Sequence, residues 1–214
     1  MNNWQTKERE KYSKVYNLGY WPKNAEQNYH GICNYVRHYI GDDKDIKLLD
    51  IGCGPGYSLN IAKAYDIDSY GIDIVPELEP TWKCNNFNCK VACCDAIPFE
   101  DSMFDIVVCL DVMEHIPEEG IDDTLNEIKR VGKHNGLNLI NISLREEEFK
   151  YGNETLHVTV KPSKWWVNKF WDFNFQPIQF ALSKGASHIQ IEAKNFKPQD
   201  KKTCVEYLGR KRQL

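Results

Sequence analysis

The sequence lacks any long apolar run. No segment approaches the roughly 20 apolar residues that a membrane-spanning helix needs. The first residues, MNNWQTKEREKYSK, are mostly polar or charged and do not form the apolar stretch of a secretory signal. We therefore expect a protein without a membrane span and with a cytoplasmic location.

An excess of charge of one sign is missing as well. The chain carries 27 Lys and Arg residues against 31 Asp and Glu residues, for a net charge of -4 at pH 7. A broad basic face that wraps nucleic acid is therefore not indicated, and nucleic acid is not expected as a partner. The basic stretch GRKRQL is interpreted as a solvated chain end.

Cysteine, in contrast, is plentiful. In the absence of a secretory signal, the eight cysteines indicate reduced thiols. Cys84, Cys89, Cys93 and Cys94 lie close together in the sequence, but they lack the paired Cys-x2-Cys spacing of structural zinc sites. We expect Cys93 and Cys94 within one strand, where neighbouring side chains point to opposite faces. The spacing argues against zinc.

Apolar segments alternate with helical patterns through the middle of the chain. Continuous apolar strands separated by helices predict a parallel sheet with both faces covered. In such sheets, ligands bind beyond the carboxyl ends of the strands. The expected strands are residues 46–52, 69–75, 89–96, 104–112 and 137–144, and the expected helices are 58–66 and 118–133.

The flanking regions are aromatic. Residues 24–40 predict a helix, and the segment up to Ile40 either covers the sheet or forms a lid over a ligand. A second helix is expected to begin at Pro162 with Ser163 as its cap. Its aromatic side chains suit the core, with one or two left for a pocket wall. Residues 181–196 and 201–211 suggest a final pair of strands.

The segment DIGCGPG, from Asp50 to Gly56, follows the first expected strand. It lacks the Lys of a phosphate-binding loop and is one residue shorter than the dinucleotide fingerprint. With the acidic residues that end the next two strands, Asp73 and Asp95, it resembles motif I and its companions in class I S-adenosylmethionine (SAM)-dependent methyltransferases. That resemblance covers about Lys47 to Ser143.

The resemblance implies a fold and a cofactor site. The fold is α/β, a Rossmann-like, seven-stranded, mostly parallel sheet flanked by helices, with an N-terminal aromatic helical segment. It implies that Asp73 accepts hydrogen bonds from the ribose hydroxyls and that Asp95 accepts one from the adenine amino group. The product would be S-adenosylhomocysteine. The implied cofactor-binding residues are Asp50, Gly52, Cys53, Gly54, Asp73, Ile74, Asp95, Ala96 and Leu110.

Three hypotheses concern the methyl acceptor. His115 either removes a proton from the acceptor or packs beneath the cofactor. Asp111, Glu114 and His115, with the distant His157, resemble the Mg²⁺-binding set of small-RNA 2′-O-methyltransferases, although Asp111 stands where that set has Glu. His157 alone, after the fifth strand, is the third hypothesis. The candidate catalytic residues are therefore His115, His157 and Glu114, and no residue is assigned as a metal ligand.

We therefore expect one domain over residues 1–214: a cap or lid at 1–45, a SAM-binding core at 46–144 and a substrate side at 145–214. The expected reaction methylates a small molecule or glycan, at oxygen rather than nitrogen, and the protein is a monomer or homodimer. One alternative is a metal-assisted RNA 2′-O-methyltransferase, with Arg145, Lys161, Lys164 and Lys169 binding phosphate. Another is a non-catalytic SAM-binding partner subunit.

Overall fold

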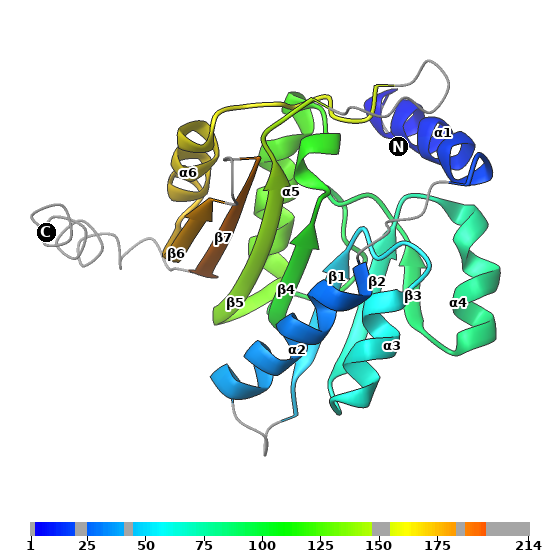
Figure 1. Ribbon diagram of the computed structural model, residues 1–214, viewed down its shortest axis with the longest axis horizontal. Coiled ribbons are helices and arrows are strands. Elements are labelled where there is room, and N and C mark those ends of the chain that lie inside the picture. The colour runs from blue at the N-terminus through cyan, green and yellow to red at the C-terminus, as the bar shows by residue number, and fades with distance from the viewer. Residues whose placement is uncertain (1–2, 20–24, 41–44, 147–154, 183–186, 196–214) are drawn as a thin grey trace, which may run out of the picture.

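Seven strands form one sheet, in the order β3-β2-β1-β4-β5-β7-β6 (Figure 1). The computed structural model describes residues 3–19, 25–40, 45–146, 155–182 and 187–195. Strand β7 runs antiparallel to both neighbours, and all other pairs are parallel. The predicted seven-stranded, mostly parallel sheet is confirmed. The strands are β1 Lys47–Ile51, β2 Asp68–Asp73, β3 Asn88–Val91, β4 Phe104–Leu110, β5 Gly132–Ser143, β6 Phe175–Leu182 and β7 His188–Asn195.

The helices connect these strands and cover the sheet. They are α1 Asn3–Asn17, α2 Ala25–Ile40, α3 Tyr57–Ala64, α4 Glu79–Asn85, α5 Glu118–Val131 and α6 Ser163–Asp172, with 3-10 turns η1 Pro76–Leu78 and η2 Met113–His115. Helix α5 buries Ile121, Leu125, Ile128 and Val131 completely, as its apolar period predicts. Within the described ranges, no helix has the length and apolar content to cross a membrane.

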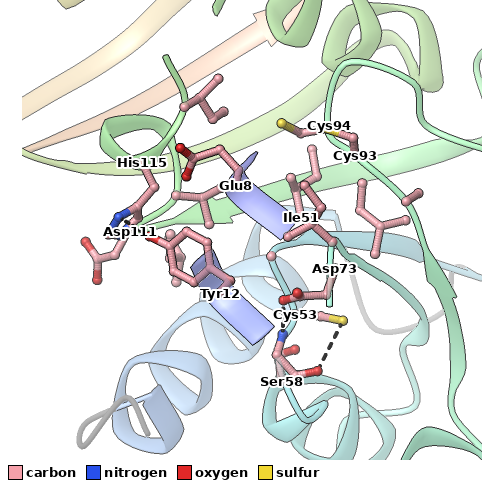
Figure 2. A pocket seen from close by; sticks show the side chains of 18 of the residues that line it. Glu8, Tyr12, Ile51, Cys53, Ser58, Asp73, Cys93, Cys94, Asp111 and His115 are labelled. Carbon is pink, nitrogen blue, oxygen red and sulfur yellow. Dashed lines mark hydrogen bonds between the residues drawn. The ribbon is translucent and has the colours of Figure 1, made fainter. Parts of the chain in front are cut away.

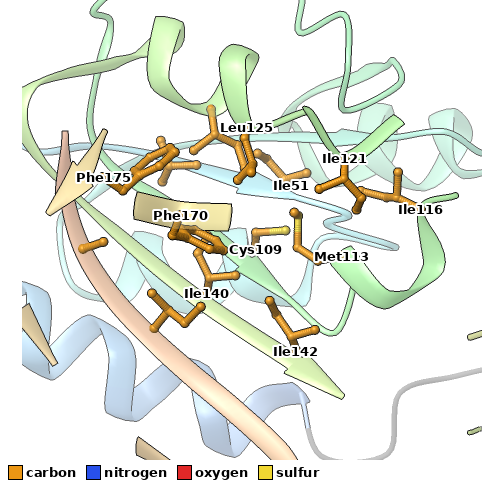
Figure 3. Close-up of a cluster of buried hydrophobic side chains, with 14 of the residues drawn as sticks. Ile51, Cys109, Met113, Ile116, Ile121, Leu125, Ile140, Ile142, Phe170 and Phe175 are labelled. Carbon is orange, nitrogen blue, oxygen red and sulfur yellow. The ribbon is translucent and has the colours of Figure 1, made fainter. Parts of the chain in front are cut away.

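Neighbouring side chains of β1 and β4 point to opposite faces of the sheet, and both faces are apolar. Ile51 and Cys109 point to the side covered by α5 and α6, where Phe170 is fully buried (Figure 3). Leu48 and Val108 point to the other side, which α2 and α3 cover. Each fully buried apolar side chain stabilises the fold by roughly 1.5–3 kcal/mol. The packing of helices on both faces therefore holds the strands, and with them their carboxyl ends, in place.

The two N-terminal helices play different parts. Helix α2 packs on the sheet through Cys33 and Val36. Helix α1 instead lies at the carboxyl end of the strands, where Trp4 contacts the start of α5. A Cβ on Gly120 would lie 2.6 Å from Trp4 Cζ2, so this contact requires glycine. The sheet-covering interpretation therefore holds for α2, and the lid stays a prediction for α1.

Two predicted strand boundaries were wrong. Strand β3 ends at Val91, because the chain turns where the Ala96 N–H donates to the Cys93 carbonyl at 3.0 Å. Cys93 and Cys94 therefore lie in a loop, not in a strand. Strand β5 begins at Gly132, before the expected start at residue 137. The pairing between β4 and β5 extends to Gly132 through an irregularity in the register.

The C-terminal expectations also need correction. Pro162, not Ser163, occupies the N-cap position of α6, and no side chain caps this helix. The final strand pair is formed by β6 and β7, with the register shifting at Pro177 on the edge strand, where proline is tolerated. Residues 201–211, expected as a strand, lie outside the described residues.

Phe170→Ala tests the layer between α6 and the sheet. Phe170 is fully buried and Phe173 only half-buried. We expect Phe170→Ala to lower the free energy of unfolding by about 3–5 kcal/mol, because it leaves a cavity in the core. Phe173→Ala, the matched control, is expected to cost less than half as much in urea titrations. Equal losses would contradict this packing.

Candidate active site

A cavity of about 400 Å³ lies at the carboxyl ends of β1, β2 and β4, beneath α1 (Figure 2). This volume lies within the usual range of small-molecule sites, roughly 300–1,000 Å³. Its walls come from segments far apart in the sequence. They include Trp4, Glu8, Tyr12 and Tyr16 of α1, Gly52, Cys53 and Gly54 after β1, Asp73 and Ile74 at β2, Ala92, Cys93 and Cys94 after β3, and Leu110, Asp111, Val112, His115 and Ile116 at and after β4.

The turn between β1 and α3 requires its glycines. Gly52 and Gly54 have φ of 75° and 51°, which favours glycine. A Cβ on Gly52 would lie 2.4 Å from Cγ2 of Val112. The Gly52 and Cys53 N–H groups donate to the Ile72 carbonyl at 2.8 and 3.0 Å. The turn therefore presents bare backbone to the cavity while β2 holds it in place.

Asp50 lies behind this turn and does not line the cavity. Its carboxylate accepts hydrogen bonds from Tyr29 at 3.0 Å and from Ser58, which joins β1 to α2 and α3. Burial, with a smaller contribution from nearby Asp73, raises the pKa of Asp50 to about 7, although the hydrogen bonds from Ser58 and Tyr29 oppose the shift. The structure thus gives Asp50 a role in holding the turn.

Asp73 does line the cavity. Its carboxylate accepts hydrogen bonds from the N–H groups of Gly54 at 2.9 Å and Val75 at 3.1 Å. Burial raises the pKa of Asp73 to about 6, although these backbone donors oppose the shift. Each carboxylate oxygen can accept a second hydrogen bond, so Asp73 fits a ligand with two neighbouring hydroxyl groups.

Asp95 and Ala96 do not line the cavity within the described residues. The Gln5 amide of α1 donates to the two carboxylate oxygens of Asp95 at 2.7 and 2.6 Å. Ala96 is exposed. The residues that α1 places in the cavity wall carry no sequence motif, and the aromatic content of the N-terminal segment is the signal that pointed to them.

His115 lines the cavity in the segment that follows β4. Its Nδ1 is 2.6 Å from the Tyr12 hydroxyl and 3.0 Å from the Leu156 carbonyl oxygen. Burial, followed by the nearby His157 and Lys11, lowers the pKa of His115 to about 3, although hydrogen bonding to the Leu156 and Asp111 carbonyls opposes the shift. His115 is therefore a neutral imidazole near pH 7.

Glu114 and His157 stand behind His115. Glu114 is fully buried, and its Oε1 accepts a hydrogen bond from the Ser143 N–H at 2.9 Å. The Glu114 carbonyl oxygen accepts from the N–H groups of Val158 and Thr159. The His157 ring packs edge-on against His115, with centroids 4.8 Å apart. Neither Glu114 nor His157 lines the cavity, so they support the segment around His115.

The potential ligand atoms of Glu114, His115 and His157 lie within 4.8 Å of one another. Asp111, the fourth member of the set, is not among them and accepts a hydrogen bond from Asn141. Mg²⁺ favours oxygen ligands in near-octahedral geometry, and imidazole suits other metals. The donor set does not fit Mg²⁺, and we derive no step through a metal.

The aromatic and basic residues of α6 do not reach the cavity. Trp166 and Phe170 are fully buried in the core, and no described residue between 155 and 182 lines the cavity. Lys161 and Lys169 form ion pairs with Glu118 and Asp122 of α5, each at 2.5 Å. The pocket wall expected from one or two aromatic residues of this helix is therefore not found among the described residues.

Comparisons with known proteins agree with this architecture. Residues 49–140 match the family described as methyltransferase domain. A sterol 4-C-methyltransferase of Caenorhabditis elegans is 31% identical over 126 residues, covering 55% of this chain and 37% of that protein. A ubiquinone biosynthesis O-methyltransferase of Rickettsia bellii is 27% identical over 160 residues, covering 65% of this chain and 63% of that protein. The aligned regions therefore span less than two thirds of these relatives.

A solved structure shares the fold. The SAM-dependent methyltransferase from Aquifex aeolicus superposes with a TM-score of 0.61 at 20% identity, covering 86% of this chain and 98% of that one. The fold is that of SAM-dependent methyltransferases, and the matched core is similar to a methyltransferase domain. The family match covers residues 49–140, less than half of the chain, and this part contains the glycine turn, Asp73 and His115.

Gly52→Ala tests the backbone cradle. The new Cβ meets Val112, and the residue must hold a left-handed φ. We expect at least a tenfold loss of SAM affinity in isothermal titration calorimetry. The control is Gly31→Ala, since a Cβ on Gly31 has nothing within 4 Å. Undiminished affinity in Gly52→Ala would contradict the cradle.

Asp73 also predicts how SAM affinity depends on pH. The ionised carboxylate is the better hydrogen-bond acceptor for hydroxyl groups. Because the pKa of Asp73 is about 6 without ligand, a bound proton must leave below that pH. We expect affinity to fall up to about tenfold per unit from pH 6 to pH 5. Asp73→Asn should bind weakly with a flatter profile, and an unchanged slope would exclude Asp73 as the cause.

Proposed function

We propose that this protein transfers a methyl group from SAM to a small-molecule acceptor, at a hydroxyl oxygen rather than at nitrogen. One observation carries the proposal: a single cavity joins the glycine turn and Asp73 to the neutral His115. A cofactor held at the first end would place its reactive end near a group that can accept a proton.

The residues present fit SAM. The bare backbone of Gly52 and Gly54 suits the amino-acid end, Asp73 suits the ribose hydroxyls, and Ile74 and Leu110 offer apolar contacts. When bound, SAM supplies an electrophilic methyl group on a sulfonium ion. The chain's own part is to orient the acceptor, exclude water and remove its proton. Helix α1 covers the cavity, and His115 is uncharged and can accept a proton.

The acceptor class follows from the cavity wall. Trp4, Val112 and Ile116 make the acceptor end largely apolar, which suits a compact ring system or a sugar ring with one reactive hydroxyl. The names of the two relatives, a sterol and a ubiquinone biosynthesis methyltransferase, support small molecules. The preference for oxygen rests on His115, because a hydroxyl must lose its proton whereas a free amine can react with its lone pair.

The structure gives less support to the alternatives. Lys161 and Lys169, which an RNA substrate would need, are paired with carboxylates, and the donor set around Glu114 does not fit Mg²⁺. A non-catalytic SAM-binding subunit would have no use for a neutral imidazole inside the cavity. Methyl transfer to a small molecule is therefore the function that we propose.

Two measurements test this function. At 100-fold excess over its dissociation constant, SAM should add about 2.7 kcal/mol of stability, roughly 5–10 °C in Tm for a chain of this size. S-adenosylhomocysteine should act similarly, and adenosine less. The absence of a shift with either cofactor form would refute the proposal.

The second measurement is turnover. With methyl-labelled SAM and a panel of phenols, sterols and free sugars, we expect label on a hydroxyl oxygen and equal rates with and without EDTA. SAM binding without labelling of any acceptor class would instead support the partner-subunit alternative. Loss of activity in EDTA, restored by a divalent cation, would bring back the metal hypothesis.

A further inference from the structure

Helix α1 places a tyrosine beside His115 in the wall of the cavity. The Tyr12 hydroxyl lies 2.6 Å from His115 Nδ1, and the two rings meet edge to face with centroids 5.6 Å apart. Both residues line the cavity, and Figure 2 shows Tyr12 reaching from α1 to His115. No sequence motif pointed to Tyr12, because its partner is 103 residues away.

The surroundings of Nδ1 define two proton positions. A carbonyl oxygen can only accept a hydrogen bond, whereas a hydroxyl can donate or accept. When Nδ1 is bare, it accepts a hydrogen bond from the Tyr12 hydroxyl. When Nδ1 carries a proton, that N–H can donate to the Leu156 carbonyl, already 3.0 Å away. The site therefore has a partner ready for each position of the proton.

We propose that Tyr12 is a catalytic residue that contacts the acceptor hydroxyl and passes its own proton to His115. The acceptor O–H bond breaks as a new O–H bond forms on Tyr12, while the original Tyr12 proton forms an N–H bond at His115 Nδ1. The electron pair stays on the acceptor oxygen and forms its bond to the methyl carbon. The positive charge lost at the sulfonium sulfur reappears on the imidazolium. This inference rests on the proposed O-methylation.

Other contacts of α1 hold Tyr12 in place. Gln5 bonds to Asp95, the Arg9 Nε donates to the Ile74 carbonyl at 3.1 Å, and the Lys11 Nζ donates to the Thr155 carbonyl at 3.2 Å. These contacts tie the helix to three separate loops. When α1 is docked, the relay is complete and the cavity is covered, so proton transfer occurs away from bulk water.

Tyr12→Phe removes the hydroxyl and leaves the ring. With the hydroxyl acceptor labelled in the panel, we expect kcat to fall 10²–10⁴-fold while KM and SAM affinity change less than threefold. Tyr65→Phe is the matched control: it deletes a Tyr–His hydrogen bond of 3.2 Å, to His30, at an exposed site outside the cavity. Unchanged kcat in Tyr12→Phe, with normal SAM binding, would overturn the relay and leave the proposed function standing.

A double-mutant cycle tests whether Tyr12 and His115 act in the same step. In a relay, His115→Ala and Tyr12→Phe remove the same step, so the double variant should be no slower than the slower single variant. If the losses of kcat in the two single variants multiply in the double variant, the proposal is overturned.

A readout without acceptor is ¹⁵N NMR of the histidine rings in the complex with S-adenosylhomocysteine. In the wild type, we expect His115 Nδ1 to be unprotonated and to accept a hydrogen bond. In Tyr12→Phe, we expect the proton to move to Nδ1, facing the Leu156 carbonyl. An identical His115 tautomer in both proteins would overturn the inference, whereas failure of the wild type to bind S-adenosylhomocysteine would refute the proposed function itself.

Discussion

The arrangement of the site depends on how the backbone N–H groups of the glycine turn find partners. Buried N–H groups must be hydrogen-bonded, and here Gly52 and Cys53 donate to the Ile72 carbonyl while Gly54 donates to Asp73. The turn can approach β2 this closely because residue 71 is glycine. A Cβ at this position would lie only 2.6 Å from Cys53 Sγ. The pairing of β1 with β2, the shape of the turn and the position of Asp73 therefore depend on one another.

The same arrangement brings two carboxylates close together in the protein interior. Asp50 and Asp73 are both buried, and the charge of Asp73 contributes to the raised pKa of Asp50. Two carboxylates in a region of low dielectric favour a cation nearby. Under the proposed function, the sulfonium ion of SAM would supply that charge, and the two carboxylates would favour SAM over its uncharged-sulfur product.

The sequence predicted the core well because the spacing of apolar residues along the chain reflects local secondary structure. The buried face of α5 and five of the strands follow from it. Edge strand β6 was missed because its aromatic residues suit helix or strand equally. Asp95 was expected to bind the cofactor, but whether a carboxylate at a strand end faces a cavity or a helix depends on tertiary packing. The same holds for Glu114, whose oxygen accepts the Ser143 N–H instead of facing the cavity.

Helix α1 has a consequence for the order of folding. Although it is made first, its contacts reach 90 residues to Asp95, 103 to His115 and 144 to Thr155. Contacts of such sequence separation form late, since they require loop closure across the whole sheet. A chain emerging from the ribosome therefore cannot complete the hydrogen bonds that hold α1 until Thr155 has been synthesised.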